Sequence, residues 1–531
     1  MRATSRSSLR LLLCFLAVAA LAGFARADTH AEAPSAPETA YETLDLFLQD
    51  QLDSLGLPGA AIVVVQHGVQ VHSAAFGKAD DSGRPMTPRT PVLLASTSKS
   101  LTAIAVMQQV EAGRLKLDEP VQTYLPWFTL RDSRSSAITV RHLLHQASGM
   151  ASADTAFEAS DAQSPGALEE GVRALSRANL ARTPGESFGY ANANYNILGL
   201  LVQTVSGRPF GDYMEENVFG PLDMTHSHPT RASALQDNVA AGHSLWFGSL
   251  WRQTEVPAPS TGMPSTTMYS SAEDLGHELM ALLNRGQYGD TRILRQESVD
   301  AMFRTGVSVD ESKGYAMGWF TRPLQEAADP ADQGSPEREL PLLLEHQGEW
   351  GNSHTYLAMV PASEIGVALV INANDTSAPS RLKAVDTNIL RILHGQAPMP
   401  TVVQEDWLQR YSWAVSLGLL LAELLSLWLT LSLLLRKRLI LRKRTPPSKP
   451  GQQRLRQALA LAAGALALDG FALWLCFVYA PARFDTHLAV IVRQFPDVGA
   501  TLVPVLALAL VWPVPRTVWL LATGLARRSE E

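Results

Sequence analysis

Cysteine is almost absent from this chain, which has two cysteines in 531 residues. Cys14 lies in an apolar segment near the N-terminus, and Cys476 lies in an apolar stretch near the C-terminus. The residues between these two segments therefore contain neither a disulfide nor a thiolate metal site, and their hydrophobic core must be sufficient without either. We expect no metal ion and no cofactor.

Positive charge is scarce between residues 28 and 411, where there are 26 lysines and arginines and 45 aspartates and glutamates. This balance of −19 argues against nucleic-acid binding, which requires a basic surface. Residues 412–531 have the opposite balance, with 14 basic and 6 acidic residues. The charge pattern therefore divides the chain into a long acidic part and a shorter basic part.

The first residues have the pattern of a cleaved signal peptide. Arginines precede an apolar run over residues 11–24, and Ala25-Arg26-Ala27 has the small-x-small form of a cleavage site. We therefore predict a signal peptide over 1–27, an extracytoplasmic domain over 28–400 and a linker over 401–411.

Three apolar stretches in the basic part are long enough to cross a membrane. We predict transmembrane helices over 412–435, 457–480 and 498–526. The loop 436–456 holds nine lysines and arginines and no acid, so it is predicted to be cytoplasmic. The loop 481–497 is then external, and the acidic domain lies on the periplasmic side of the plasma (inner) membrane.

Two acidic residues interrupt the apolar stretches. At about 1.5 Å per residue, Glu423 and Asp469 lie roughly 16–18 Å inside the membrane, near its midplane. A charge is costly there, so each side chain is expected to face protein. They either bond the helices together or line a path by which an amphiphilic substrate reaches the domain.

The acidic domain is predicted to be α/β (α+β). A helix over 40–55 and a hairpin over 60–66 and 69–76 begin it, and strands return after a long helical middle. The later elements are strands over 315–320, 340–345, 355–360 and 365–372 and a helix over 380–394. Strands at both ends predict one antiparallel sheet flanked by helices, with an inserted helical region. Residues 151–165 are predicted to form a mobile surface excursion.

The stretch Ser96-Thr97-Ser98-Lys99 leads into a buried helix. Ser96 and Lys99 are three positions apart, so their side chains lie on one face of that helix. A serine hydroxyl beside a lysine amine is a nucleophile beside a base. Backbone N–H groups at the start of the helix could stabilise an oxyanion.

Two further stretches complete a pattern. They are Tyr190-Ala191-Asn192 and, on a predicted strand, His346-Gln347-Gly348. In order and spacing, the three stretches resemble the three motifs of the serine β-lactamase and penicillin-binding-protein family, in its class C-like branch. The resemblance covers roughly residues 40–395 and implies a β-lactamase-like fold.

The resemblance implies a role for each residue. Ser96 attacks a carbonyl group, and Lys99 and Tyr190 share its proton, with either as the base. Substrate binding and the oxyanion hole are assigned to Asn192, His346, Gly348 and the backbone N–H groups of Ser96 and Glu349. Histidine at position 346 replaces the lysine that anchors carboxylates in β-lactamases, which lowers the expectation of antibiotic hydrolysis. His142 and His145 are predicted to be structural.

The leading hypothesis is a membrane-anchored serine hydrolase that cleaves an amide or ester of a small molecule or peptide, which could be acylated. Its three-span plan resembles the periplasmic peptidases of colibactin-type pathways, which remove an N-acyl-D-amino-acid cap. Those enzymes tend to carry serine where Asn192 stands. The alternatives are a cell-wall D-Ala-D-Ala carboxypeptidase or other penicillin-binding protein, an esterase, a weak β-lactamase and a non-catalytic ligand sensor.

Overall fold

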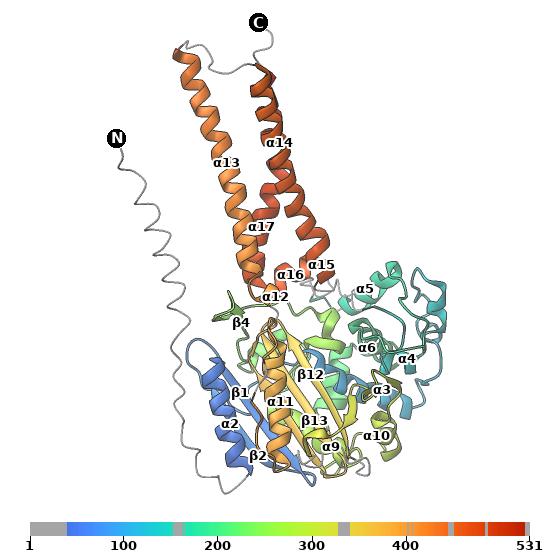
Figure 1. Ribbon diagram of the computed structural model, residues 1–531. Helices are drawn as coiled ribbons and strands as arrows, with labels where there is room; N and C mark the ends of the chain where they lie inside the picture. The colour runs from blue at the N-terminus through green and yellow to red at the C-terminus, as the bar shows by residue number, and fades with distance from the viewer. Residues whose placement is uncertain are drawn as a thin grey trace.

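An eight-stranded antiparallel sheet forms the centre of the fold (Figure 1). The computed structural model describes residues 40–151, 163–164, 166–327, 340–400, 403–405, 407–443, 451–483 and 487–525. The strand order is β2-β1-β14-β13-β12-β11-β10-β9. The strands are β1 (Gly59–Gln66), β2 (Val69–Gly77), β9 (Val307–Ser308), β10 (Gly314–Tyr315), β11 (Phe320–Pro323), β12 (Leu342–Trp350), β13 (Ser353–Val360) and β14 (Ile365–Ile371). Because β1 pairs with β14, the prediction of one sheet built from both ends of the domain is confirmed.

Helices cover both faces of this sheet. On β1, Ile62 and Val64 pack with α2 (Ala40–Leu55) and α11 (Pro379–Leu393), which lie together on one face (Figure 1). The alternate residues Val63 and Val65 join the larger core that contains α9 (Ala272–Leu283) and α3 (Ser98–Glu111). Alternation along a strand thus places the same apolar run in two hydrophobic layers.

The inserted region is helical, as predicted. Its α-helices are α3, α4 (Val140–Leu144), α5 (Ala167–Ala174), α6 (Asn192–Ser206), α7 (Phe210–Met214), α8 (Arg231–Gln236), α9 and α10 (Gln296–Phe303). The helix α3 packs against α6 and is buried along nearly its whole length. Most of the predicted excursion, residues 152–162 and 165, lies outside the described residues, as does the predicted signal peptide.

The predicted strand over 315–320 is wrong. Tyr315 ends β10 and Phe320 begins β11, and the residues between them form a turn that contains Gly318. The backbone of Gly318 has φ +87°, and a Cβ there would lie 3.1 Å from the carbonyl oxygen of Lys99. The turn therefore rests directly on the start of α3, and glycine permits both the dihedral angle and the close approach.

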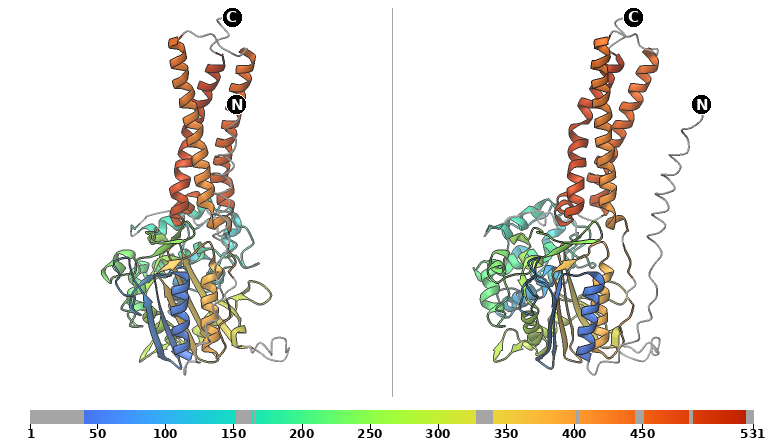
Figure 2. Two further views of the ribbon diagram at one scale, coloured as in Figure 1. Left: turned by 60° about the vertical axis from the view of Figure 1, so that its left-hand side comes forward. Right: turned by 90° about the vertical axis from the view of Figure 1, so that its left-hand side faces the viewer.

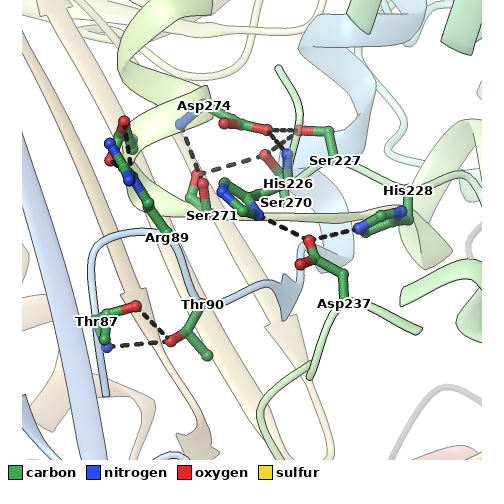
Figure 3. Close-up of polar contacts among 11 residues, drawn as sticks. Thr87, Arg89, Thr90, His226, Ser227, His228, Asp237, Ser270, Ser271 and Asp274 are labelled. Carbon is green, nitrogen blue, oxygen red and sulfur yellow. Dashed lines mark hydrogen bonds and ion pairs between the residues drawn. The ribbon is translucent and has the colours of Figure 1, made fainter. Parts of the chain in front are cut away.

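A polar cluster braces the segment that leads to Ser96 (Figure 3). The side chain of Ser271 caps α9 by accepting a hydrogen bond from the N–H of Asp274. The Asp274 carboxylate accepts from the hydroxyl of Ser227, and the Asp237 carboxylate accepts from the rings of His226 and His228. These contacts hold β6 (Tyr269–Ser270), which pairs with β3 (Val92–Leu93) just before the nucleophile.

The C-terminal residues form a helical bundle that rises from one end of the domain in both views of Figure 2. Among the described residues, two helices are long and apolar enough to cross a membrane, over Trp413–Ser432 and Leu459–Ala482, and a pair bent by 44° would make a third span. The bundle comprises α13 (Ser412–Lys443), α14 (Gly451–Trp474), α15 (Ala480–Arg483), α16 (Leu488–Gln494), α17 (Pro496–Val511) and α18 (Pro513–Leu525).

Both predicted loops of this tail are largely helical. Residues 436–443 extend α13, residues 451–456 begin α14, and 444–450 lie outside the described residues. The predicted external loop contains α16 and the start of α17. The linker also contains a short helix, α12 (Trp407–Arg410). Apolarity marks where a membrane core could lie, but helices continue beyond that core until a turn residue ends them.

Arg516 joins the two acidic residues of the tail. Its guanidinium donates to Glu423 on α13, at 3.4 Å, and to Asp469 on α14. It also donates to the hydroxyl of Ser426 and the carbonyl of Ala465, at 2.9 and 3.0 Å. Arg516 and Glu423 are each 1% exposed. The arrangement favours the interpretation of the acids as bonds between helices.

Loss of Arg516 alone should destabilise the protein, because two buried carboxylates would lose their cation. We expect Arg516→Met to lower the free energy of unfolding by about 3–5 kcal/mol, the usual cost of breaking a buried ion pair. Thermal unfolding in detergent micelles, followed by circular dichroism, tests this. The matched control replaces Arg516, Glu423 and Asp469 together with Met, Gln and Asn and should recover most of the loss. Equal losses in both variants would contradict the role assigned to the charges.

Candidate active site

Ser96 lies in a strained turn between β3 and α3. The turn is a 3₁₀ turn over Ala95–Thr97, and Ala95 has φ +50°, a left-handed conformation that is rare for residues other than glycine. The carbonyl of Leu94 holds the turn in place by accepting from the hydroxyls of Thr97 and Thr355, at 2.8 and 2.6 Å. These bonds compensate for the strain and present Ser96 at the start of α3.

Lys99 is buried and faces Ser96. Its Nζ lies 3.1 Å from Ser96 Oγ, and it donates to Asn192 Oδ1 at 2.8 Å and to the carbonyl of Ser265 at 2.9 Å. A neutral amine has two N–H groups and one lone pair. Because Asn192 and Ser265 accept the two N–H groups, the lone pair of the neutral form is directed at Ser96 Oγ. The ammonium form can donate to all three oxygens, so the site accommodates both forms.

Tyr190 and Asn192 stand where the chain enters α6. Lys99 Nζ lies 4.8 Å from the centroid of the Tyr190 ring. The backbone before the helix is fixed by Gln146, whose side-chain oxygen accepts from the N–H of Ala191 at 3.0 Å. The carbonyl of the same glutamine accepts from the N–H of Gly189, at 2.8 Å. The end of α4 therefore positions the second motif.

His346 is a buried, neutral side chain on β12. Burial, assisted by the nearby charge of Lys99, lowers the pKa of His346 to about 3. Its Nδ1 donates to the carbonyl of Gln347 at 2.7 Å, and its Nε2 lies 3.4 Å from the hydroxyl of Tyr315. Position 346 thus carries no positive charge at neutral pH.

Gly348 allows β12 to approach the nucleophile. A Cβ at this position would overlap the carbonyl oxygen of Leu94 and the hydroxyl of Thr355. These are the groups that hold the turn before Ser96. The glycine of the third motif is therefore a packing requirement of the site.

The edge of β12 next to Ser96 is open. Pairing with β11 ends at Glu345, so the following residues of β12 face the nucleophile turn instead of a strand. Along this edge the carbonyl of Gln347 accepts from His346, and the N–H of Gly351 donates to Gln494 of the tail. Alternation places the N–H of Glu349 on the same edge. Such an N–H, with that of Ser96, fits an oxyanion hole.

A cavity of about 650 Å³ opens over these groups. Ser96, Tyr190, His346 and Glu349 line one part of it, and Phe320 stacks beside Tyr190 with ring centroids 6.3 Å apart. A small molecule or the end of a peptide fits this volume. All three predicted motifs therefore meet at one cavity.

Residues 44–388 match the family model described as Beta-lactamase. The chain belongs to the β-lactamase and penicillin-binding-protein family of serine hydrolases.

Relatives of this β-lactamase-family chain include protein flp of Staphylococcus aureus (strain COL), 27% identical over 351 residues, which are 66% of each chain. The putative penicillin-binding protein PbpX of Bacillus subtilis (strain 168) is 28% identical over 277 residues, 52% of this chain and 65% of that protein. The chain therefore matches about two thirds of the length of these relatives.

A solved structure of the octameric penicillin-binding protein homologue from Pyrococcus abyssi has a similar fold. It superposes with a TM-score of 0.57 at 26% identity, over 68% of this chain and 79% of that one. The comparison confirms the predicted fold class.

Two contributors to this β-lactamase-family site were missed from the sequence. The Ser265 carbonyl belongs to a π turn over Met263–Thr267, and Gln146 follows α4 with φ +56°. Ser265 acts through its backbone carbonyl, which has no side-chain signature, and Gln146 accepts hydrogen bonds through its side-chain oxygen and its carbonyl from a turn that the sequence does not mark as part of the site. His145 is structural in geometry, since its Nδ1 lies 3.3 Å from the Tyr315 carbonyl and burial lowers its pKa to about 4.

His346 should not set the pH dependence of the reaction. With a pKa lowered to about 3, its ring stays neutral at mildly acidic, neutral and basic pH. We predict that His346→Gln, which keeps a neutral polar side chain, leaves the midpoint of the acid limb of kcat/KM unchanged. A shift of that midpoint would mean that the ring binds a proton during turnover.

Proposed function

We propose that this protein is a serine hydrolase that cleaves an amide or ester through an acyl-enzyme on Ser96. The observation that carries the proposal is the position of Lys99 Nζ, 3.1 Å from Ser96 Oγ, while it also donates to Asn192 Oδ1 and to the carbonyl of Ser265. A lysine held in this way can accept the serine proton and keep its orientation as it does so.

The chemistry proceeds in two half-reactions. Ser96 Oγ bonds to the carbonyl carbon while its proton passes to Lys99 or Tyr190, and the N–H groups of Ser96 and Glu349 stabilise the oxyanion. The bond to the leaving group then breaks, and the departing amine or alcohol takes up the proton. Water next adds to the acyl-enzyme, which releases a carboxylic acid and regenerates Ser96.

The charge of position 346 bears on the substrate. A cell-wall carboxypeptidase or a β-lactamase must bind a substrate carboxylate, and a neutral His346 supplies no cation for it. Asn192 directs its side-chain oxygen at Lys99, which commits that atom to the catalytic lysine. We therefore favour cleavage of an amide or ester without a required carboxylate. Removal of an N-acyl-D-amino-acid cap is the narrower candidate. The amine that leaves in this cleavage does not have to be bound through a carboxylate.

The proposed location is the periplasmic face of the inner membrane, with the bundle as a multi-pass anchor. The two or three apolar helices support an anchor. The basic segment between α13 and α14 supports a cytoplasmic position for that end of the bundle. The catalytic domain, at the other end of the bundle in Figure 2, would then be outside the cytoplasm.

A fluorophosphonate probe tests the nucleophile. We expect intact-protein mass spectrometry to find one adduct on the native protein and none on Ser96→Ala. The substitution removes one hydroxyl, so the melting temperature should not fall. Lys99→Ala and Tyr190→Phe should each slow labelling by several orders of magnitude, because they belong to one proton relay. Wild-type turnover by Ser96→Ala would refute the mechanism.

Reporter fusions test the topology. Alkaline phosphatase should be inactive when fused at Pro450 and active when fused at Asp485, because it folds only outside the cytoplasm. The two sites lie on either side of the second apolar helix, which makes each the control for the other. The opposite result would place the catalytic domain in the cytoplasm.

A further inference from the structure

We propose that the segment of the tail formed by α16 and α17 positions the open edge of β12, which carries the N–H of Glu349 assigned to the oxyanion hole. Gln494 is the positioning residue. This inference rests on the proposed hydrolase function and goes beyond it. The tail would then be part of the catalytic apparatus as well as an anchor.

Gln494 touches the catalytic strand directly. Its Oε1 accepts from the N–H of Gly351 at 3.2 Å, and the side chain is 8% exposed. A Cβ on Gly351 would lie 2.7 Å from the backbone oxygen of Gln494 and 2.8 Å from its Oε1. Gly351 does not have a positive φ, so the approach of the tail is what requires glycine here.

Gly351 is two residues after Glu349, whose N–H is one oxyanion donor, and it is linked through packing to Ser96, whose N–H is the other. It follows Trp350, whose side chain packs in a buried cluster with Leu93 and Ala95. Ala95 is the strained residue immediately before Ser96. A shift of Gly351 would therefore move the N–H of Glu349 along the strand and the N–H of Ser96 through Trp350.

The other bonds of this turn come from the catalytic domain. Ser244 donates to the carbonyl of Gly351 at 2.6 Å, and Asn374 donates to the carbonyl of Trp350 at 2.8 Å. Both act on carbonyl groups. Gln494 is the partner of the N–H on the open edge, the edge that also carries the N–H of Glu349.

A second contact fixes the tail segment against the domain. The Asp497 carboxylate accepts from the N–H of Phe247 at 3.0 Å. Phe247 lies at the tip of the hairpin β4 (His243–Trp246) and β5 (Leu250–Gln253), and its ring packs on Trp413 at the start of α13. Docking at two points gives the segment a defined orientation, so Gln494 can impose a position on β12.

The experiment compares Gln494→Met with Gln494→Glu in the full-length protein. Methionine keeps the volume and loses the acceptor, whereas glutamate keeps an acceptor for the N–H of Gly351. We expect Gln494→Met to slow the phosphonylation of Ser96 by the fluorophosphonate, in which fluoride leaves, about 10-fold, less than the loss of a whole oxyanion donor. On an amide or ester substrate it should lower kcat with little change in KM, as expected for an interaction made in the transition state. Gln494→Glu should stay within about threefold of wild type.

The control is Thr501→Val, which removes a hydroxyl that donates to carbonyls of its own helix, α17. It should leave the rate of phosphonylation by the probe and the melting temperature unchanged. An unchanged rate of phosphonylation in Gln494→Met, or an equal loss in Gln494→Met and Gln494→Glu, would overturn the inference. Failure of the native protein to react with the probe would instead refute the hydrolase function, so the two failures are distinguishable.

Discussion

Lys99 is fully buried, and a buried amine is tolerated only where its N–H groups find acceptors. Those acceptors come from distant parts of the chain: Asn192 opens α6, and Ser265 lies in the π turn before β6. The nucleophile stands in the 3₁₀ turn that leads directly into the helix of the lysine. The packing of α6 and of the π turn on α3 therefore brings both acceptors to one side chain.

Close approach is the second requirement of the site, and two residues make it possible. Ala95 adopts a left-handed conformation without being glycine, and Gly348 lets β12 reach the carbonyl of Leu94. The hydroxyls of Thr97 and Thr355 converge on that same carbonyl. Strain at a functional site persists only where its surroundings hold it. Here the holding groups lie on both sides of the seam between helix and sheet, so the nucleophile is correctly placed only when the two parts are assembled.

Local spacing explains what could be predicted from the sequence. Ser96 and Lys99 are three positions apart where a helix begins, and short apolar runs identified β1, β13 and β14, which are buried on both faces. The missed features depend on residues that meet only in the folded chain. A backbone carbonyl such as that of Ser265 has no side-chain signature, and the turn at Gly318 is dictated by contact with α3. Arg516 was overlooked because it follows prolines in an apolar stretch, and its partners lie 93 and 47 residues earlier.

Arg516 also bears on how an anchor can influence an active site. Replacing a whole buried ion cluster by apolar residues often costs little stability, whereas removing one partner alone is costly, so the three side chains must be placed together. In a single orientation of α18, Arg516 contacts both Glu423 on α13 and Asp469 on α14. The helix α18 follows α17 after a bend at Trp512. The start of α17 and the end of α16 contact the domain through Asp497 and Gln494. The start of α13 is held separately by the packing of Trp413 on Phe247. The helices of the bundle are therefore joined to one another by Arg516, and the bundle contacts the domain both at α16–α17 and at the start of α13. The position of β12 then depends on the tail as well as on the domain.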